Sequence, residues 1–428
     1  MSLDDLEAEL DALVVGTNPD RWAVAAYRVG VARSESATTD DLVADALGLL
    51  DKAGRILTPK RSPIEHARIL TAAANCHRRL ANPQRAAELF EQAAGLLAQR
   101  SALPEQAAAL TNVGLARIEI GQPTLALDPL TRAIELVTPD AQLGTEQRRV
   151  RGAALLNRAQ AYQASPGRES LLAAVDDYRS AADDFDSEAP QRGMALHGLG
   201  ATILELGKRG GDAGVDEALV AFQDCLRILT VDSFPFQHAL ARHSLGIAYE
   251  QRSGSLDLAR ALNAVEMSLS ILDPRLHKPQ WNTAAGTLGR VEAQLGIDHV
   301  TGRIGHIVRL MATTDESERA GMLRERLTRL SHLPVARTRR DLAGLAAALT
   351  GTTVDDYELV VRSMVPVLME LPEAVLEAAC AELCAAHQNT EDQVAFDDAL
   401  DRVVHDLLHG PQRVRIRDLL EQYGWVRP

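Results

Sequence analysis

Apolar and small residues recur along the chain at helical spacing, and one short phrase returns several times. Residues 243–250 read HSLGIAYE, and related phrases are NVGLARIE at 112–119, HGLGATIL at 197–204 and GTLGRVEA at 286–293. In each phrase a small residue lies among larger apolar ones at the spacing of a helix face. This pattern predicts helices whose small residues let a neighbouring helix approach closely.

The small residues of these phrases follow one another at a nearly regular interval. In chain order they are Gly30, Ala74, Gly114, Ala159, Gly200, Gly246 and Gly289. From Ala74 onward the intervals are 40, 45, 41, 46 and 43 residues. A period of this length predicts a supersecondary unit that is repeated along the chain.

A second phrase follows each copy up to the sixth. It has a small residue, a large one four positions later and usually another small one three beyond that. The instances are Ala46/Leu50/Ala53, Ala86/Phe90/Ala93, Ala126/Leu130/Ala133, Ala174/Tyr178/Ala181, Ala218/Phe222/Cys225 and Ala261/Val265/Ser268. These positions share one helix face, and turn signals such as LANPQ at 80–84 separate the two phrases. Each unit therefore predicts a helix, a turn and a helix, stacked on its neighbours around a shared core.

These positions resemble the tetratricopeptide repeat. The small residue of the first helix is followed three positions later by a large one, as at Tyr162, Ile203 and Tyr249, and then by the second phrase. The period exceeds the usual ~34 residues, as in the long repeats of kinesin light chains and bacterial scaffold proteins. The resemblance implies an all-α fold, a right-handed α–α superhelix of about six to seven repeats over residues 1–312.

The repeat fades beyond residue 312, although the helical pattern continues. We expect helices near 316–331, 334–350, 354–370, 372–387, 391–409 and 411–423. Thr352 or Thr353 is the expected N-cap of the third of these helices. Residues 313–428 form either a cap for the exposed end of the solenoid or an independent helical binding module.

Composition and charge exclude several classes of protein. The formal net charge of −14 disfavours binding to nucleic acid and to anionic membranes. No run reaches the ~18 apolar residues of a membrane span, and the acidic start MSLDDLEAELD does not read as a signal peptide. Four cysteines in 428 residues do not form a disulfide framework. We therefore expect a cytoplasmic protein that does not associate with membranes.

One group of side chains raises the question of a metal site. Cys380, Cys384 and His387 fall at i, i+4 and i+7 of a helix, and His405 and His409 follow downstream. Such ligands on two facing helices could hold zinc. The same spacing is that of a buried helix face, and cysteine is among the most buried residue types. The second interpretation is favoured, so we expect neither a metal nor another cofactor.

No motif in the chain indicates catalysis. The segment GKRGGDAG at 207–214 is rich in glycine, but no Ser or Thr follows its lysine and both flanks are helical. It therefore does not match a phosphate-binding loop, and we expect a connection between helices. Neither a G-x-S-x-G nor an H-E-x-x-H sequence occurs. We expect no catalytic residues.

The resemblance implies a binding surface, because tetratricopeptide repeats usually contact ligands through the first helix of each pair. The corresponding positions lie three before, one after and four after the small residue. The candidate residues are Thr71, Asn75, Arg78, Thr111, Ile118, Gln160, Gln163, His197, His243, Ile247, Glu250 and Arg290. The row contains no lysine, so the family's clamp for peptide C-termini does not fit. We expect one or more partner proteins or peptide segments, and self-association is possible.

Two classes of function fit these expectations. The first is a non-catalytic interaction scaffold or assembly factor that binds a partner segment in the groove. The alternative is a sensor of a ligand or peptide whose C-terminal helices act on an effector or on nucleic acid. His197 and His243 share one register, so binding could change near their ordinary pKa of about 6.5. Trp425 either packs on the terminal helices or belongs to a recognition tail.

Overall fold

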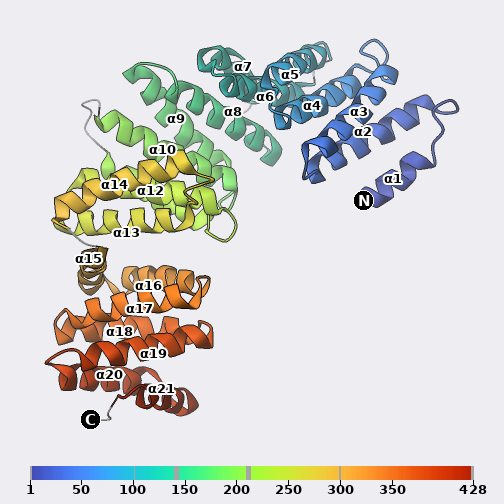
Figure 1. Ribbon diagram of the computed structural model, residues 1–428. Helices are drawn as coiled ribbons and strands as arrows, with labels where there is room; N and C mark the ends of the chain where they lie inside the picture. The colour runs from blue at the N-terminus through green and yellow to red at the C-terminus, as the bar shows by residue number, and fades with distance from the viewer. Residues whose placement is uncertain (1, 101, 139–143, 209–213, 298–299, 426–428) are drawn as a thin grey trace. The chain divides into compact units, whose positions relative to one another are not determined.

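The computed structural model describes residues 2–100, 102–138, 144–208, 214–297 and 300–425. Every regular element in these ranges is an α-helix, which confirms the predicted all-α fold (Figure 1). The helices divide into two compact units, residues 1–230 and residues 231–428. The predicted boundary between the repeats and a C-terminal module, at residues 312 and 313, stays a prediction.

Unit 1 contains the helices α1 (Leu3–Asp11), α2 (Pro19–Ser36), α3 (Asp40–Ile56), α4 (Pro63–Arg79), α5 (Pro83–Ala98), α6 (Leu103–Glu119), α7 (Pro123–Val137), α8 (Thr145–Gln163), α9 (Arg168–Asp184), α10 (Pro190–Lys208) and α11 (Val215–Ile228). Unit 2 contains α12 (Pro235–Arg252), α13 (Ser255–Ile271), α14 (Lys278–Leu295), α15 (Val300–Thr313), α16 (Glu316–Ser331), α17 (Val335–Thr350), α18 (Val354–Met369), α19 (Glu373–Gln388), α20 (Gln393–Leu407) and α21 (Gly410–Gln422).

The sequence marks where many of these helices begin. Pro63, Pro83 and Pro123 are the first residues of α4, α5 and α7, where a fixed φ is favourable and no amide hydrogen is needed. In the turn between α6 and α7, Gly121 has φ = +79°, a conformation that costs glycine little. The prolines and glycines of the predicted turns therefore lie where one helix ends and the next begins, as predicted.

Within a pair, the two helices meet where a small residue faces a large one. A methyl carbon added at Gly200 of α10 would lie 2.7 Å from the ring of Phe222 in α11. One added at Gly246 of α12 would lie 2.5 Å from Val265 in α13. The same contact joins Gly30 to Leu50 and Gly114 to Leu130. The predicted role of the two phrases is confirmed at these pairs.

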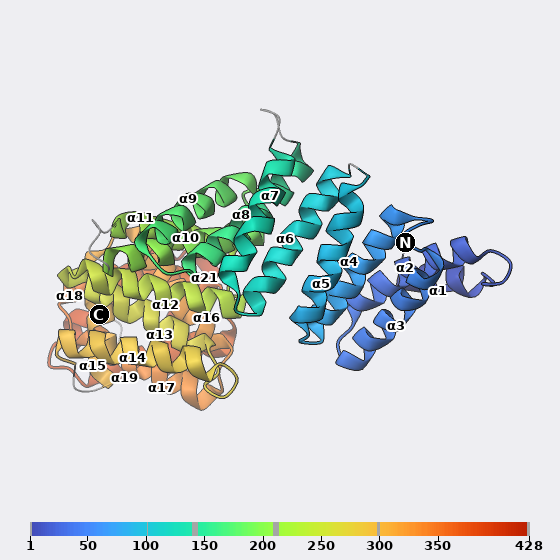
Figure 2. The same ribbon diagram turned by 90° about the horizontal axis from the view of Figure 1, so that it is seen from above.

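In unit 1 the first helices of the pairs lie on one side and the second helices lie on the other (Figures 1 and 2). Each helix packs against the next along the chain, so the pairs share their apolar faces. One buried cluster extends from Ala23 in α2 to Ala116 in α6. We use the term first-helix face for the outward positions of α2, α4, α6, α8 and α10 in unit 1. The corresponding positions of unit 2 lie on α12 and α14 and are described by themselves.

The copy of the repeat at Gly289 departs from this pattern. A methyl carbon added at Gly289 of α14 would meet no atom within 4 Å. The next helix, α15, packs against α13, α17 and α18 instead. The expectation that Gly289 is a helix contact is therefore wrong, because the second phrase that would supply the covering side chain is absent after this copy.

The C-terminal helices pack in a different order. Here α15, α17, α19 and α21 contact one another in succession, and so do α16, α18 and α20. The six helices expected in this region all exist, with ends within about two residues of those predicted. Thr353 is the N-cap of α18, since its hydroxyl accepts a hydrogen bond from the amide of Asp356. Trp425 is only 4% exposed, so the indole packs into the unit.

Gly200→Leu tests the packing of a helix pair. The larger side chain would collide with Phe222, and we expect the free energy of unfolding of the full chain to fall by about 1–3 kcal/mol in urea denaturation followed by circular dichroism. Gly48→Ala is the control, because Gly48 of α3 has open space beside it and should gain about 0.5–1 kcal/mol. An unchanged stability for Gly200→Leu would contradict the assignment.

Candidate partner-binding surface

The candidate residues on α4 differ in how far a partner could contact them. Thr71 is half-buried and donates its hydroxyl to the carbonyl of Ala67 in the preceding turn, at 3.0 Å. The guanidinium of Arg78 forms an ion pair with the carboxylate of Glu119 in α6. Asn75, between them on the same helix, is exposed. Among the candidate residues of α4, Asn75 is therefore the most available to a partner.

The candidates on α6 and α8 are more enclosed. Thr111 is buried, with its hydroxyl on the carbonyl of Ala107, and Ile118 packs against the cluster around Leu130. Gln160 is half-buried on α8. Gln163, one turn later, accepts a hydrogen bond of 2.8 Å from the Tyr178 hydroxyl.

On α10, His197 is half-buried, and its ring lies 5.8 Å from that of Phe222. On α12, His243 is buried, with Nε2 2.9 Å from the hydroxyl oxygen of Thr287. Burial lowers the pKa of His243, and the nearby Arg290 lowers it further. His197 and His243 thus share a register in the repeat but have different surroundings.

Two of the remaining candidates, Glu250 and Arg290, form an ion pair between the first helices α12 and α14. The guanidinium of Arg290 in α14 donates two hydrogen bonds, of 3.0 and 2.9 Å, to the carboxylate of Glu250 in α12. This pairing raises the pKa of Arg290. Ile247, one position after Gly246, is half-buried. The charges at these positions are neutralised within the protein.

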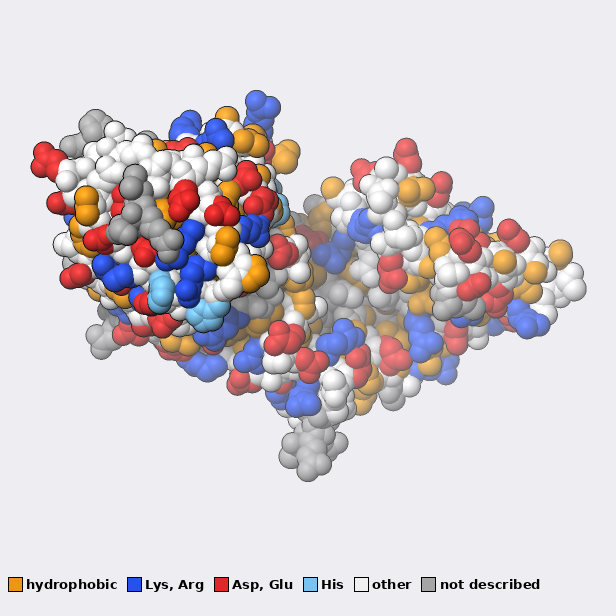
Figure 3. Space-filling model, turned by 90° about the horizontal axis from the view of Figure 1, so that it is seen from below, with side chains coloured by type: hydrophobic (Ala, Val, Ile, Leu, Met, Phe, Trp, Pro, Cys, Tyr) orange, Lys and Arg blue, Asp and Glu red, His pale blue; other side chains and the backbone are white. Residues whose placement is uncertain are grey.

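Other charged side chains of the surface are also paired with one another. Ion pairs join successive first helices, as between Arg68 of α4 and Glu105 of α6 at 3.2 Å. Figure 3 shows acidic and basic side chains interspersed over one face of the molecule. Among the candidates that are neither buried nor ion-paired, the groups left to a partner include the amides of Asn75 and Gln160 and the aliphatic side chain of Ile247. No described helix has the length and apolar character needed to cross a membrane.

A cluster of half-buried and buried charged side chains surrounds α16, and no sequence pattern indicated it. The carboxylate of Glu325 lies 2.6 Å from the guanidinium of Arg242 in α12 and 3.8 Å from Nε2 of His238. Burial favours the neutral acid, but His238 and Arg242 outweigh it, so the pKa of Glu325 is lowered. Arg326, the next residue, donates to Asn263 of α13 at 2.9 Å. These contacts hold α16 against α12 and α13, the last complete pair. The residues are too far apart in the sequence to form a recognisable motif.

The cysteine and histidine group of α19 is part of the core. Cys380 and Cys384 are buried, and burial raises the pKa of each thiol to about 12. His387 is fully buried, with Nδ1 2.7 Å from Asp397 and Nε2 2.8 Å from the hydroxyl oxygen of Tyr357. Both ring nitrogens are thus engaged, so the ring is not placed to bind a metal. Among the described residues, no group of three potential ligands could hold one.

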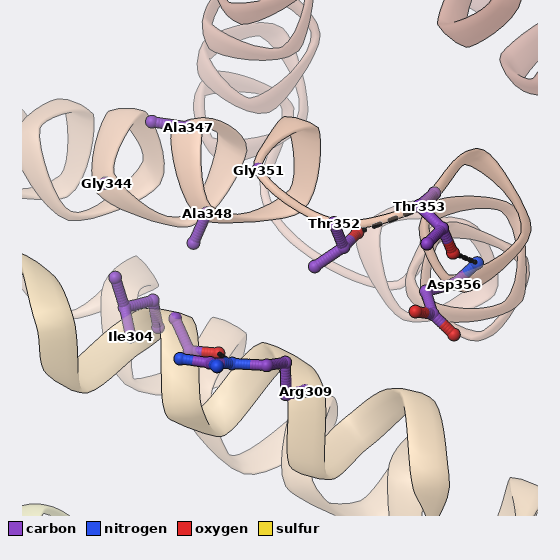
Figure 4. Close-up of a pocket in the computed structure, with 10 residues that line it drawn as sticks. Ile304, Arg309, Gly344, Ala347, Ala348, Gly351, Thr352, Thr353 and Asp356 are labelled. Atoms are coloured by element: carbon purple, nitrogen blue, oxygen red, sulfur yellow. Dashed lines mark hydrogen bonds between the residues drawn. The ribbon is translucent and has the colours of Figure 1, made fainter.

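A hollow of about 680 Å³ lies between α15 and α17, beside the start of α18 (Figure 4). Its walls are short side chains and backbone, including Gly305 on α15 and Gly344 on α17. The charged groups on its rim are Arg309 and Asp356, and the hydroxyl groups are those of Thr352 and Thr353. No sequence motif marks this hollow, because it arises where α15 and α17 carry glycine and alanine at facing positions. The glycine-rich loop considered above lies largely at residues 209–213, outside the described residues.

Comparisons with known proteins concern the fold alone. Neither a family model nor a curated protein sequence matches the chain. Solved structures similar to it include the nearly identical TPR-like repeats of a kinesin-light-chain-type protein from Podosopora anserina, 21% identical with a TM-score of 0.38, covering 50% of this chain and 96% of that one. The TPR protein YrrB, described with an unusual peptide-binding site, is 21% identical with a TM-score of 0.33, covering 56% and 98%.

A third similar structure is a signal transduction ATPase with numerous domains and a tetratricopeptide repeat sensor, from Pyrococcus horikoshii. It is 15% identical with a TM-score of 0.34, covering 88% of this chain and 54% of that one. All three similar structures contain tetratricopeptide-type repeats, the class that the repeated phrases of this chain resemble. The assignment of the helix pairs rests on the contacts within this chain.

His387→Phe tests the core role of the histidine. An aromatic ring is kept, although a somewhat larger one, and the buried Asp397 carboxylate loses the hydrogen bond from His387. We expect a loss of about 3 kcal/mol in the free energy of unfolding, measured in urea. Asp397→Asn, which keeps an acceptor for Nδ1–H, should cost less than half as much. Equal costs for the two variants would contradict this role.

Stability should also depend on pH in the range where histidine titrates. Burial lowers the pKa values of His243 and His387 below the ordinary 6.5. As pH falls below about 7, the unfolded chain takes up protons that the folded chain does not, so the free energy of unfolding should decrease toward pH 5.5. Urea denaturation at pH 7.5 and 5.5 measures this decrease. His243→Gln should reduce it, and an unchanged pH dependence in this variant would contradict the contribution of His243.

Proposed function

We propose that the protein is a non-catalytic interaction scaffold or assembly factor that binds a segment of a partner protein on the first-helix face. The observation that carries the proposal is that, in the first helices of the complete pairs, different residues pack against the second helix and face outward. The small residue at the centre of the phrase is committed to packing, as Gly200 is against Phe222 and Gly246 is against Val265. The candidate positions around it differ from copy to copy.

The chemistry of the face indicates the kind of segment it fits. Arg78 and Arg290 are paired with Glu119 and Glu250, so these candidate positions offer little net charge. The exposed Asn75 and the half-buried Gln160 each present a group that donates and accepts hydrogen bonds. A partner segment of mixed apolar and uncharged polar residues fits such a face better than a strongly charged one. We place this binding in the cytoplasm, without a cofactor.

The test inserts charge at the two amide positions. Asn75→Glu combined with Gln160→Glu should weaken a partner at least tenfold, because two unpaired carboxylates would be desolvated on binding. Gln92→Glu is the matched control, since Gln92 is exposed on the second helix α5. The three proteins would serve as baits in the source organism, with recovered proteins quantified by mass spectrometry.

Candidates lost only with the double variant would then be purified and titrated by calorimetry against all three proteins. A partner that binds the double variant as tightly as the unaltered chain would contradict binding on the first-helix face. A partner lost equally with Gln92→Glu would also contradict it.

A further inference from the structure

Arginines gather where α16 ends and α17 begins. The segment 324–341 contains six arginines and two acidic residues, although the formal net charge of the whole chain is −14. Near the start of α17 the hydroxyl of Thr338 donates to the carbonyl of Leu330 near the end of α16, at 2.9 Å. Because this contact holds the two helix ends together, arginines from both helices lie at one corner of the fold. We call the surface formed by Arg329, Arg337 and Arg340 the basic corner.

A single carboxylate lies among these three arginines. One oxygen of Asp341 is 3.6 Å from a guanidinium nitrogen of Arg329, and the other is 3.9 Å from Nε of Arg340. The charge of Arg337 also acts on Arg329, since it lowers the pKa of that guanidinium. No carboxylate in the described part of the chain forms an ion pair with Arg337 itself. Three guanidinium groups therefore share one acidic partner.

The positive charge of Arg329 is incompletely compensated. Burial lowers its pKa, and the charges of Arg326 and Arg337 lower it further, which outweighs the opposite effect of Asp341 and Glu266. Glu266 is already paired with Arg326 at 2.9 Å. The buried Nε of Arg329 donates to no acceptor among the described residues. Since an arginine stays protonated in proteins, the basic corner holds more positive charge than its own carboxylates balance.

A second arginine cluster of the C-terminal helices shows the contrast. Arg413 donates to two backbone carbonyls at the end of α20, both at 2.7 Å. Arg415 pairs with Glu373, and Arg417 pairs with Asp401 at 2.6 Å. All three guanidinium groups of that cluster are therefore used within the fold, whereas the arginines at the start of α17 are exposed.

We propose that the basic corner binds an acidic segment of a partner protein, whose carboxylates pair with Arg337 and Arg340. Guanidinium groups bind carboxylates through two parallel hydrogen bonds, and the exposed side chain of Arg340 is open to such a contact. Arg329 is half-buried behind them and stays paired with Asp341.

The rest of the chain favours a short acidic segment over a nucleic acid. With a net charge of −14, the surface around the basic corner would repel a long polyanion, whereas a short segment contacts the corner alone. The basic corner lies within unit 2, and the proposal does not depend on binding at the first-helix face.

The test uses a fluorescent hexaglutamate peptide as the probe. We expect saturable binding to the full chain by fluorescence anisotropy at low ionic strength, where exposed charges are least screened. Arg337→Gln combined with Arg340→Gln should weaken this binding at least tenfold, because two of the three guanidinium groups are lost. A hexaglutamine peptide should not bind.

The matched control is Arg168→Gln combined with Arg275→Gln, which removes two exposed arginines elsewhere and changes the net charge equally. This variant should bind hexaglutamate like the unaltered chain. Absence of saturable binding would overturn the proposal, and so would an equal loss of affinity in the two double variants. Stronger competition by a hexathymidylate DNA than by unlabelled hexaglutamate would show a nucleic-acid site, and would overturn the assignment to an acidic protein segment.

Discussion

The structure of the repeats depends on one contact, in which a large side chain of the second helix sits on a small residue of the first. Dispersion and hydrophobic contacts fall off steeply with separation, so helices joined in this way pack along their length only if the small residue stays small. Phe222 on Gly200 and Val265 on Gly246 are two instances. Each pair then offers a regular apolar surface to the next, which is why a shared core can extend from Ala23 to Ala116.

Because of this contact, the residues that determine the fold of a pair differ from those that could determine what it binds. Substitutions at the packing positions change stability, whereas the neighbouring positions can change without disturbing the pair. The structure also shows that not every outward position is free. Thr111 is buried, and Arg78 and Arg290 are held in ion pairs, so the surface open to a partner is smaller than the repeat pattern alone implies.

The helices and caps could be predicted from the sequence where the signal lies in neighbouring residues. Thr353 caps α18 as predicted, and the helix expected at 316–331 is α16. Both could be predicted because capping and helical periodicity depend on residues within one or two turns of each other. The small-to-large contact was predictable because it is repeated. At Gly289 the same rule failed, since it requires a second phrase that the sequence lacks there.

The interactions that escaped prediction join distant parts of the chain. Glu325 and Arg242 are separated by 83 residues, and nothing in either neighbourhood marks them as a pair. The hydrogen bonds of His387 are made with Tyr357 and Asp397 from two other helices, so the sequence of its own helix does not show them. Long-range polar pairing of this kind follows from the fold, so it becomes visible only once the helices are placed.

The most direct test of the central contact is a double-mutant cycle between Gly246 and Val265 in the full chain. Gly246→Ala alone should destabilise by crowding Val265, and Val265→Ala alone should destabilise by leaving a cavity. If the two residues meet as described, the double variant should recover at least about 1 kcal/mol relative to the sum of the single losses. Losses that add within experimental error would contradict the account.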